Sequence, residues 1–511
     1  MNQFIDLFRQ DMNIFYEKTK AFYNGEITKA EYKGISGGFG SYAERDGKAN
    51  MLRLRLPGGR ISKDTLAFIL QQVEDHQLDT IKLTTCETIQ LHHLEPDTLF
   101  DIASKALDFG IICRGGGGDF PRNVIVSPLT GVQKDEYFDV MPYALAASDY
   151  LLSFIHGPKL PRKLKVAFSN SPENVPHATF RDLGFTANKD GSFDVYCAGG
   201  LGNNPKFGVR VAEQIAGEDI LYYIHAMVDL FIEHGNYQNR GRARSRYLQD
   251  TLGKEGLIKA FQEKLSIAKQ DPSLKLSVSP IPVNKTGNGT ISNDRVIAQK
   301  QEGLFAVSYQ PIGGLISPQT LKAISDIIQD MEDVELRISP FEEIYIINLT
   351  ADEAQKVLDV TKDGAATPLE HSVACIGASI CQQGVRDSQS LLRECIAAAN
   401  ASNLPANAFP QIHISGCPSS CGTHQTGLIG FHGGVKLIDK VPHPAFTLHV
   451  NGCDKQGLER MGTQLGVILQ SKIPAFLLDL AQAAADADMD FVSWFNSHKD
   501  DFDAITKKYL I

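Results

Sequence analysis

The chain has no long uninterrupted apolar run, and this absence sets the first limits on its class. Its 511 residues contain no stretch of about 18 uncharged apolar residues, the length that a transmembrane helix needs. The amino-terminal segment carries Asp6, Arg9 and Asp11 within its apolar pattern, whereas a signal peptide has an unbroken apolar core. We therefore expect a cytoplasmic protein that makes no membrane contact and begins with an amphipathic helix.

Basic residues and cysteines are also scarce. Lys and Arg number 50 against 60 Asp and Glu, which gives a formal net charge of -10. A general nucleic-acid binder shows the opposite balance, so that class is excluded. The nine cysteines are an odd number, and without a secretion signal they do not predict a disulfide framework. Cysteines that cluster in sequence are instead candidates for metal ligands.

A repeated segment divides the chain into two halves. GGRISKDTL at 58–66 aligns with GGLISPQTL at 313–321, which is an offset of 255 residues (from 58 to 313). The same offset, without gaps, aligns IKLTTCETIQL at 81–91 with LRISPFEEIYI, which starts at Leu336. Two matching blocks at one offset indicate a duplicated unit.

Each copy has the pattern of strand, helix, strand and helix. Residues 51–59 alternate apolar and charged side chains and end at a glycine pair, as a strand and its turn do. Ser62 is a helix-cap candidate, the strand pattern returns from 81, and a second helix is expected to end at Gly110. The pattern predicts an α+β fold in which each half contains a ferredoxin-like half domain and a larger αβ domain.

The expected domains follow from these patterns and from the polar stretch SPIPVNKTGNGTISND. They are an amino-terminal helical extension (1–50), a first half domain (51–110), a larger αβ domain (111–278), a linker (279–303), a second half domain (304–361), and a cysteine-bearing domain with carboxy-terminal helices (362–511).

Four cysteines form the most informative constellation. Cys375 and Cys381 are spaced C-x5-C, and Cys417 and Cys421 are spaced C-x3-C. Four thiolates suit a soft metal ion or an iron–sulfur cluster, and the glycines around them allow backbone amides to point at sulfur. Structural zinc usually has two to four residues between paired cysteines, so a zinc module is the less favoured alternative. The other alternative is that these four cysteines are buried and unrelated to one another.

C-x5-C followed by G-C-P-x-x-C resembles the sirohaem and 4Fe-4S signature of the sulfite and nitrite reductases. The resemblance extends to LPGGRIS, the TT and IQLH blocks of one strand, PRNV, PRKLK and an Arg-rich helix, NRGRARSRYL, all in the family's order. It implies that Cys375, Cys381, Cys417 and Cys421 bind a 4Fe-4S cluster. It also implies that Cys421 bridges to the iron of the sirohaem.

The resemblance further implies six-electron reduction of a small oxyanion, sulfite or nitrite. Arg122, Lys163 and Lys165 match family cations that hold the substrate, and Asn123, Arg240 and Arg244 are expected to contact the sirohaem. The Lys-x-Lys form resembles sulfite reductases, whereas nitrite reductases more often have Lys-x-Asn, so sulfite is favoured. Because no GxGxxG motif lies in a strand-to-helix context, the electron donor is expected to be a separate protein such as ferredoxin.

One position departs from the family pattern. The family has TTR where this chain has Thr84, Thr85 and Cys86, so a cysteine stands in place of a substrate arginine, and Glu87 is expected to add a negative charge nearby. Cysteine offers almost no hydrogen-bond donor to an anion. Three interpretations remain: another cation compensates (Arg53, Arg55 or Arg114), the substrate differs, or Cys86 has its own role. A non-catalytic sirohaem and cluster protein is the alternative function.

Overall fold

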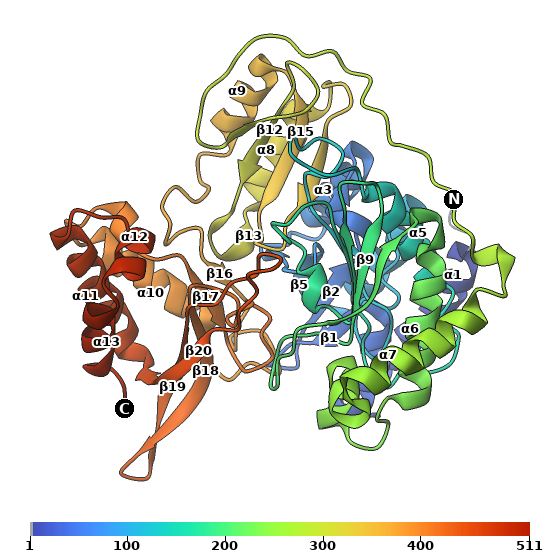
Figure 1. Cartoon of the computed structure of the whole chain (residues 1–511), viewed down its shortest axis with the longest axis horizontal. Coiled ribbons are helices and arrows are strands. Elements are labelled where there is room, and N and C mark those ends of the chain that lie inside the picture. The colour runs from blue at the N-terminus through green and yellow to red at the C-terminus, as the bar shows by residue number, and fades with distance from the viewer. Residues whose placement is uncertain (1–3) are drawn as a thin grey trace.

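Four five-stranded sheets organise the chain (Figure 1). The computed structural model describes residues 4–511. Two of the sheets form a pair of half domains and two form larger αβ units. Within the described residues, no helix is both long and apolar enough to span a membrane.

The two half-domain sheets exchange their edge strands. The first has the order β1 (Ser41–Ala43), β2 (Asn50–Leu54), β5 (Ile89–Leu94), β4 (Ile81–Leu83) and β13 (Leu315–Ile316). The second has the order β11 (Val296–Ala298), β12 (Phe305–Tyr309), β15 (Ile344–Leu349), β14 (Glu335–Ile338) and β3 (Arg60–Ile61). Strand β13 pairs with β4 and β3 pairs with β14, both antiparallel. Since β3 and β13 lie in the segments aligned by the repeat, this exchange confirms the duplication.

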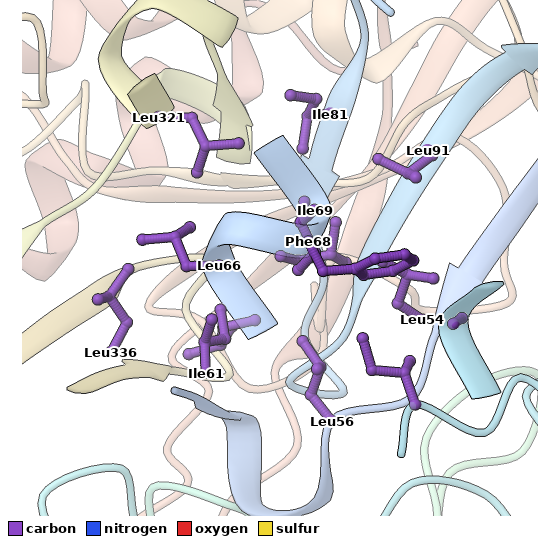
Figure 2. Close-up of a cluster of buried hydrophobic side chains, with 14 of the residues drawn as sticks. Leu54, Leu56, Ile61, Leu66, Phe68, Ile69, Ile81, Leu91, Leu321 and Leu336 are labelled. Carbon is purple, nitrogen blue, oxygen red and sulfur yellow. The ribbon is translucent and has the colours of Figure 1, made fainter. Parts of the chain in front are cut away.

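Each half domain has two helices: α3 (Lys63–Asp75) and α4 (Pro96–Ala106) in the first, and α8 (Pro318–Ile328) and α9 (Ala351–Val360) in the second. Helices α3 and α8 pack against each other across the exchange. As predicted, the side chain of Ser62 caps α3 by accepting the N–H of Thr65. Figure 2 shows Leu66 of α3 beside Leu321 of α8 and Leu336 of β14, and all three are buried. Burial of apolar surface from both copies holds the halves together.

The two larger sheets share one topology. Strands β6 (Ile125–Val126), β7 (Val166–Ser169) and β8 (Leu183–Ala187) are parallel, and β9 (Phe193–Cys197) and β10 (Val209–Ile215) follow antiparallel. Strands β16 (Val373–Ala374), β17 (Ile412–Ser415), β18 (Ile429–Ile438), β19 (Val441–Val450) and β20 (Thr463–Leu469) repeat that order and those directions. The duplication therefore includes the larger units.

Helices complete each larger unit (Figure 1). The first has α5 (Met141–Leu152), α6 (Ile220–His234) and α7 (Leu248–Ala268), and the second has α10 (Ser388–Asn400), α11 (Ile473–Asp486), α12 (Phe491–Ser497) and α13 (Lys499–Lys507). The amino-terminal helices are α1 (Ile5–Tyr23) and α2 (Lys29–Ser36).

Three segments differ from the sequence prediction. Strand β1 lies inside the expected helical extension, and β11 lies inside the expected linker, because each finds a pairing partner on a half-domain sheet. The Arg-rich segment is not a helix: two short 3-10 turns, Arg240–Arg242 and Ser245–Tyr247, precede α7. The side chain of Asn239 accepts the N–H of Gly241, a local bond that competes with helical hydrogen bonding.

Candidate active site

One cavity of about 1060 Å³ brings the predicted site residues together. Its walls come from both halves of the chain. The predicted cluster cysteines are there (Cys375, Cys381, Cys417 and Cys421), and so are the predicted substrate cations (Arg122, Lys163 and Lys165). The walls also include the predicted sirohaem contacts (Asn123, Arg240 and Arg244) and Cys86, the cysteine that stands in place of the family arginine. Residues that are far apart in sequence therefore share one enclosed space.

The cysteines lie at the carboxyl edge of the second larger sheet. Cys375 directly follows β16, and Cys417 follows β17 by two residues. The sulfur of Cys375 accepts the N–H of Gly416 at 3.1 Å, and the sulfur of Cys381 accepts the N–H of Gln383 at 3.4 Å. Backbone amides thus point at sulfur, as predicted. Such bonds stabilise an anionic cluster.

The predicted substrate cations lie on two adjacent segments of the first larger unit. Leu164 bridges Pro121 in parallel, and the N–H of Arg122 donates to the carbonyl of Leu164 at 2.8 Å. Leu164 is fully buried in the core, so Lys163 and Lys165 on either side of it face the cavity, because alternate residues of an extended segment share a side. The two motifs therefore present their three cations together.

The glycine run at 115–118 holds two arginines of the cavity wall in place. The guanidiniums of Arg122 and Arg53 both donate to the carbonyl of Gly116, at 2.7 Å and 2.5 Å. A Cβ on Gly117 would lie 2.4 Å from the carbonyl oxygen of Gly37, so only glycine permits this close packing. In the structure the run packs tightly and anchors cations.

Of the three candidate compensating cations predicted from sequence, Arg53 lines the cavity. Arg55 instead donates to the carbonyls of Arg114 and Arg122, and Arg114 forms an ion pair with Asp11 at 2.7 Å. Neither of the latter two lines the cavity.

Cys86 faces the cavity from a turn that both halves hold in place. The amide of Asn123 donates to the carbonyl of Cys86 at 3.1 Å, and the hydroxyl of Thr85 donates to the carbonyl of Cys421 at 2.9 Å. The ammonium of Lys165 donates to the sulfur of Cys86 at 3.1 Å. Burial alone would raise the pKa of this thiol, but the positive charges of Lys165 and Arg181 outweigh it and lower the pKa to about 6.

Arg181 is a cavity cation that the sequence analysis missed. It stands between Phe180 and β8 and belongs to none of the motifs. Its Nε donates to the carbonyl of Pro176 at 2.9 Å, and its Nη2 lies 3.4 Å from Nδ1 of His177. No local pattern marks it; the fold alone brings it beside Cys86.

The expectation for Glu87 was wrong. Its carboxylate is fully buried and accepts the N–H of Val126 at 3.0 Å, and it does not line the cavity. Burial raises the pKa of Glu87 well above the ordinary value, which favours the neutral carboxylic acid. Glu87 therefore connects the half domain to β6, and its carboxyl lies outside the cavity lining.

The two arginines among the predicted sirohaem contacts are ion-paired to cavity acids, whereas Asn123 donates to backbone carbonyls. Arg240 pairs with Asp119 at 2.7 Å, and Arg244 pairs with Asp182 at 3.1 Å. Nε of Arg244 and Nε of Arg122 are buried and have no hydrogen-bond partner within residues 4–511. Buried donors without partners are rare. A cavity with spare cationic donors fits a macrocycle that carries many carboxylates.

Single-ion zinc on the cysteines finds no support in the geometry. Over the described part of the chain, one group has three ligand atoms at the spacing a metal ion needs, and it consists of His424, His432 and His449 rather than cysteines. Three of the other cysteines fit structural roles: Cys113, Cys197 and Cys395 are buried in three separate hydrophobic cores.

Comparison with known proteins gives the family. The description "Nitrite and sulphite reductase 4Fe-4S domain" matches residues 117–269, and "Nitrite/Sulfite reductase ferredoxin-like half domain" matches 42–108 and 297–363. Together these matches cover more than half of the chain. The chain belongs to the nitrite and sulfite reductase family. It is thus an oxidoreductase with a 4Fe-4S cluster and a sirohaem.

Individual relatives of this reductase fall on both sides of the family. "Sulfite reductase [ferredoxin] 1" of Mycolicibacterium paratuberculosis is 26% identical over 426 residues, which are 80% of this chain and 74% of the relative. The chloroplastic ferredoxin–nitrite reductase of Arabidopsis thaliana is 25% identical over 399 residues, 75% of this chain and 67% of the relative. The solved structure of Mycobacterium tuberculosis NirA shares the fold, with a TM-score of 0.75 at 23% identity over 93% of this chain and 92% of that one.

Proposed function

We propose that this reductase converts sulfite to sulfide by six-electron transfer from ferredoxin in the cytoplasm. The observation that carries the proposal is the convergence of Arg122, Lys163 and Lys165 on the cavity that also holds the four cysteines. Fixed cations are what a small oxyanion needs for binding. When bound, the cluster and sirohaem supply the electrons and the iron that coordinates the substrate.

The protein's own groups would bind the oxyanion and supply protons. Arg122 offers a fixed guanidinium, because its Nη1 and Nη2 are held by the carbonyls of Gly116 and Gly118. Burial lowers the pKa of Lys163 and of Lys165. A buried ammonium with a lowered pKa gives up a proton more readily, which suits a reaction that turns substrate oxygens into water.

Cys86 does not remove the positive charge of the site. Its thiolate would offset Lys165, its hydrogen-bond partner, while Arg53, Arg122, Lys163 and Arg181 remain on the cavity wall. This balance supports compensation for the lost arginine. It therefore favours a working catalyst over a sirohaem protein without turnover.

Sulfite is preferred over nitrite because of the Lys-x-Lys pair. Both lysines line the cavity, so the residue that distinguishes the two patterns, Lys165, is positioned to contact substrate. Named relatives reduce either anion, and both use ferredoxin. Ferredoxin is proposed as the donor on that ground.

The test is turnover by the purified holoenzyme with a strong one-electron donor. The protein must first show sirohaem absorption and about five irons per chain, four from the cluster and one from the sirohaem. We expect sulfide from sulfite with a higher kcat/KM than ammonia from nitrite. Lys165→Asn should lower the ratio of kcat/KM for sulfite to kcat/KM for nitrite. Lys159→Asn, a control at the cavity rim, should leave this ratio unchanged. A loaded enzyme that reduces neither anion would overturn the proposal.

A further inference from the structure

Three histidines form a cluster that the reductase chemistry does not use. His424 lies in the turn after Cys421, His432 lies on β18 and His449 lies on β19. Their ring centroids are 5.0, 4.8 and 5.1 Å apart, so each ring contacts the other two. One ring nitrogen from each residue lies within 4.8 Å of the others.

The backbone is shaped to bring these rings together. In the β18–β19 pair, Gly430 lies opposite His449 and His432 opposite Thr447, so His432 and His449 are diagonal neighbours on one face. A Cβ on Gly430 would lie 1.8 Å from the carbonyl oxygen of His424. Glycine at that position therefore lets the turn press onto the same face of the sheet and deliver the third ring.

The cluster is buried and its hydrogen bonding is incomplete. His424 is 1% exposed and His449 is 6% exposed, while His432 is half-buried. Nδ1 of His432 and Nε2 of His449 are hydrogen-bonded at 2.8 Å, but Nδ1 of His424 has no partner anywhere in the described chain. A buried polar atom without a partner costs about 1–3 kcal/mol. Three ring nitrogens that lie close together, with one buried ring nitrogen lacking a hydrogen-bond partner, are typical of a set of metal ligands without a bound ion.

The chemistry of the cluster selects the class of ion. Each of the three rings offers one nitrogen atom to the cluster, and the imidazole nitrogen is the commonest metal ligand in proteins. Neutral imidazoles suit divalent zinc, copper or nickel, whereas calcium and magnesium require oxygen ligands. Partial exposure of His432 leaves a route from solvent for the ion and for a water molecule as a fourth ligand.

We propose that His424, His432 and His449 form a second metal site, which binds a zinc-class divalent transition ion and ties the loop of Cys417 and Cys421 to β18 and β19. The site is separate from the iron centres and does not depend on which anion the enzyme reduces. Its protein ligands would all be nitrogen atoms, whereas those of the iron–sulfur cluster would all be sulfur atoms. The role is structural, since the ion would fix the turn that follows the proposed bridging ligand, Cys421.

The test uses holoenzyme that carries its full iron complement, so that no cluster thiol is free to bind zinc. The protein is incubated with Zn²⁺, passed over a desalting column and analysed for metals. Wild type should retain one zinc per chain in addition to its irons. His449→Gln should bind zinc at least about tenfold more weakly, and His443→Gln, on the same strand outside the cluster, should bind it as wild type does.

Two results would overturn the site. The first is that the wild-type protein, with its full iron content, retains no zinc. The second is that the His432→Ala, His449→Ala double variant retains as much zinc as the wild type. If the double variant loses its sirohaem spectrum, wild-type crystals soaked in Zn²⁺ decide instead. An anomalous peak at the zinc edge among the three rings supports the site, and peaks found only elsewhere exclude it.

Discussion

The sulfur of Cys86 lies 3.1 Å from the ammonium nitrogen of Lys165 and accepts its hydrogen bond. This contact joins the position where the chain departs from its family to one of the cations that the family pattern predicts. Opposite charges at such a distance stabilise each other. Removal of the thiolate should therefore change how strongly the site attracts an anion.

Cys86→Ser should lower the KM for sulfite. At pH 8 the thiolate repels a dianion and offsets the positive charge of Lys165, whereas a neutral hydroxyl does neither. We expect KM to fall by up to about tenfold, which corresponds to about 1.4 kcal/mol, as measured by steady-state kinetics at saturating reductant. Cys453→Ser is the matched control, because Cys453 does not line the cavity. An unchanged KM would show that the thiolate does not affect the bound anion.

The effect of Cys86→Ser should depend on pH. The folded pKa of the thiol is about 6, which is below its ordinary value. Above pH 6 the group is a thiolate, and below it a neutral thiol. The ratio of the wild-type KM to the Cys86→Ser KM should therefore be largest near pH 8 and approach one near pH 5. Sulfite also takes a proton in this range, but a ratio measured on one substrate cancels that change.

The same thiolate should contribute to stability. Because its folded pKa is depressed, the contribution is fully present above the unfolded pKa of about 8.5 and is lost as pH falls through 6. The difference in unfolding temperature between wild type and Cys86→Ser should shrink over that window.

Local patterns predicted much of this site, and tertiary contacts supplied the rest. The four cysteines, Arg122 and Lys163 could be predicted because each lies in a short motif. Arg181 could not, since its neighbours in sequence carry no signal and only the fold brings it to Cys86. The exchange of β3 and β13 could not be predicted from the sequence for a related reason, because a two-residue edge strand is too short to show a pattern of alternating residues.

The Arg-rich segment and Glu87 were mispredicted for different physical reasons. Arg240 follows Asn239, whose side chain bonds to the backbone and favours a turn over a helix. Glu87 was assigned to the site because it follows Cys86, but its positive φ of 54° turns its carboxylate toward Val126 instead.

Gly117→Ala should destabilise the protein and impair catalysis together. The added methyl group would meet the Gly37 carbonyl at 2.4 Å and the Tyr42 hydroxyl at 2.8 Å, so the run that holds Arg122 and Arg53 must shift. Overpacking of this kind costs about 1–3 kcal/mol. We expect a lower unfolding temperature and a lower kcat/KM. Gly256→Ala in α7, where a Cβ meets only Leu252 at 3.6 Å, should lower neither.

The duplication itself offers a final comparison, because Glu87 and Glu342 occupy equivalent positions with φ of 54° and 63°. Each accepts a backbone N–H from the adjoining larger sheet, of Val126 or Ala374. Only Glu342 forms a buried ion pair, with Lys82. Burial raises the pKa of Glu87 well above its ordinary value, and it raises that of Glu342 to about 7. At pH 8 Glu342 therefore favours the charged form, which its ion pair with Lys82 stabilises, whereas the burial of Glu87 opposes its ionisation.

Glu342→Gln should therefore be much more destabilising than Glu87→Gln at pH 8. The first substitution leaves the ammonium of Lys82 buried without its partner, which costs about 3–5 kcal/mol. The second replaces a carboxyl that accepts the N–H of Val126 with an amide of nearly the same shape, and it leaves no buried ammonium without its partner. Thermal unfolding of the two variants measures the contrast, and Glu342→Gln combined with Lys82→Met should recover part of the loss, because no unpaired charge remains. Equal unfolding temperatures for the two single variants would show that the ion pair between Lys82 and Glu342 does not stabilise the protein.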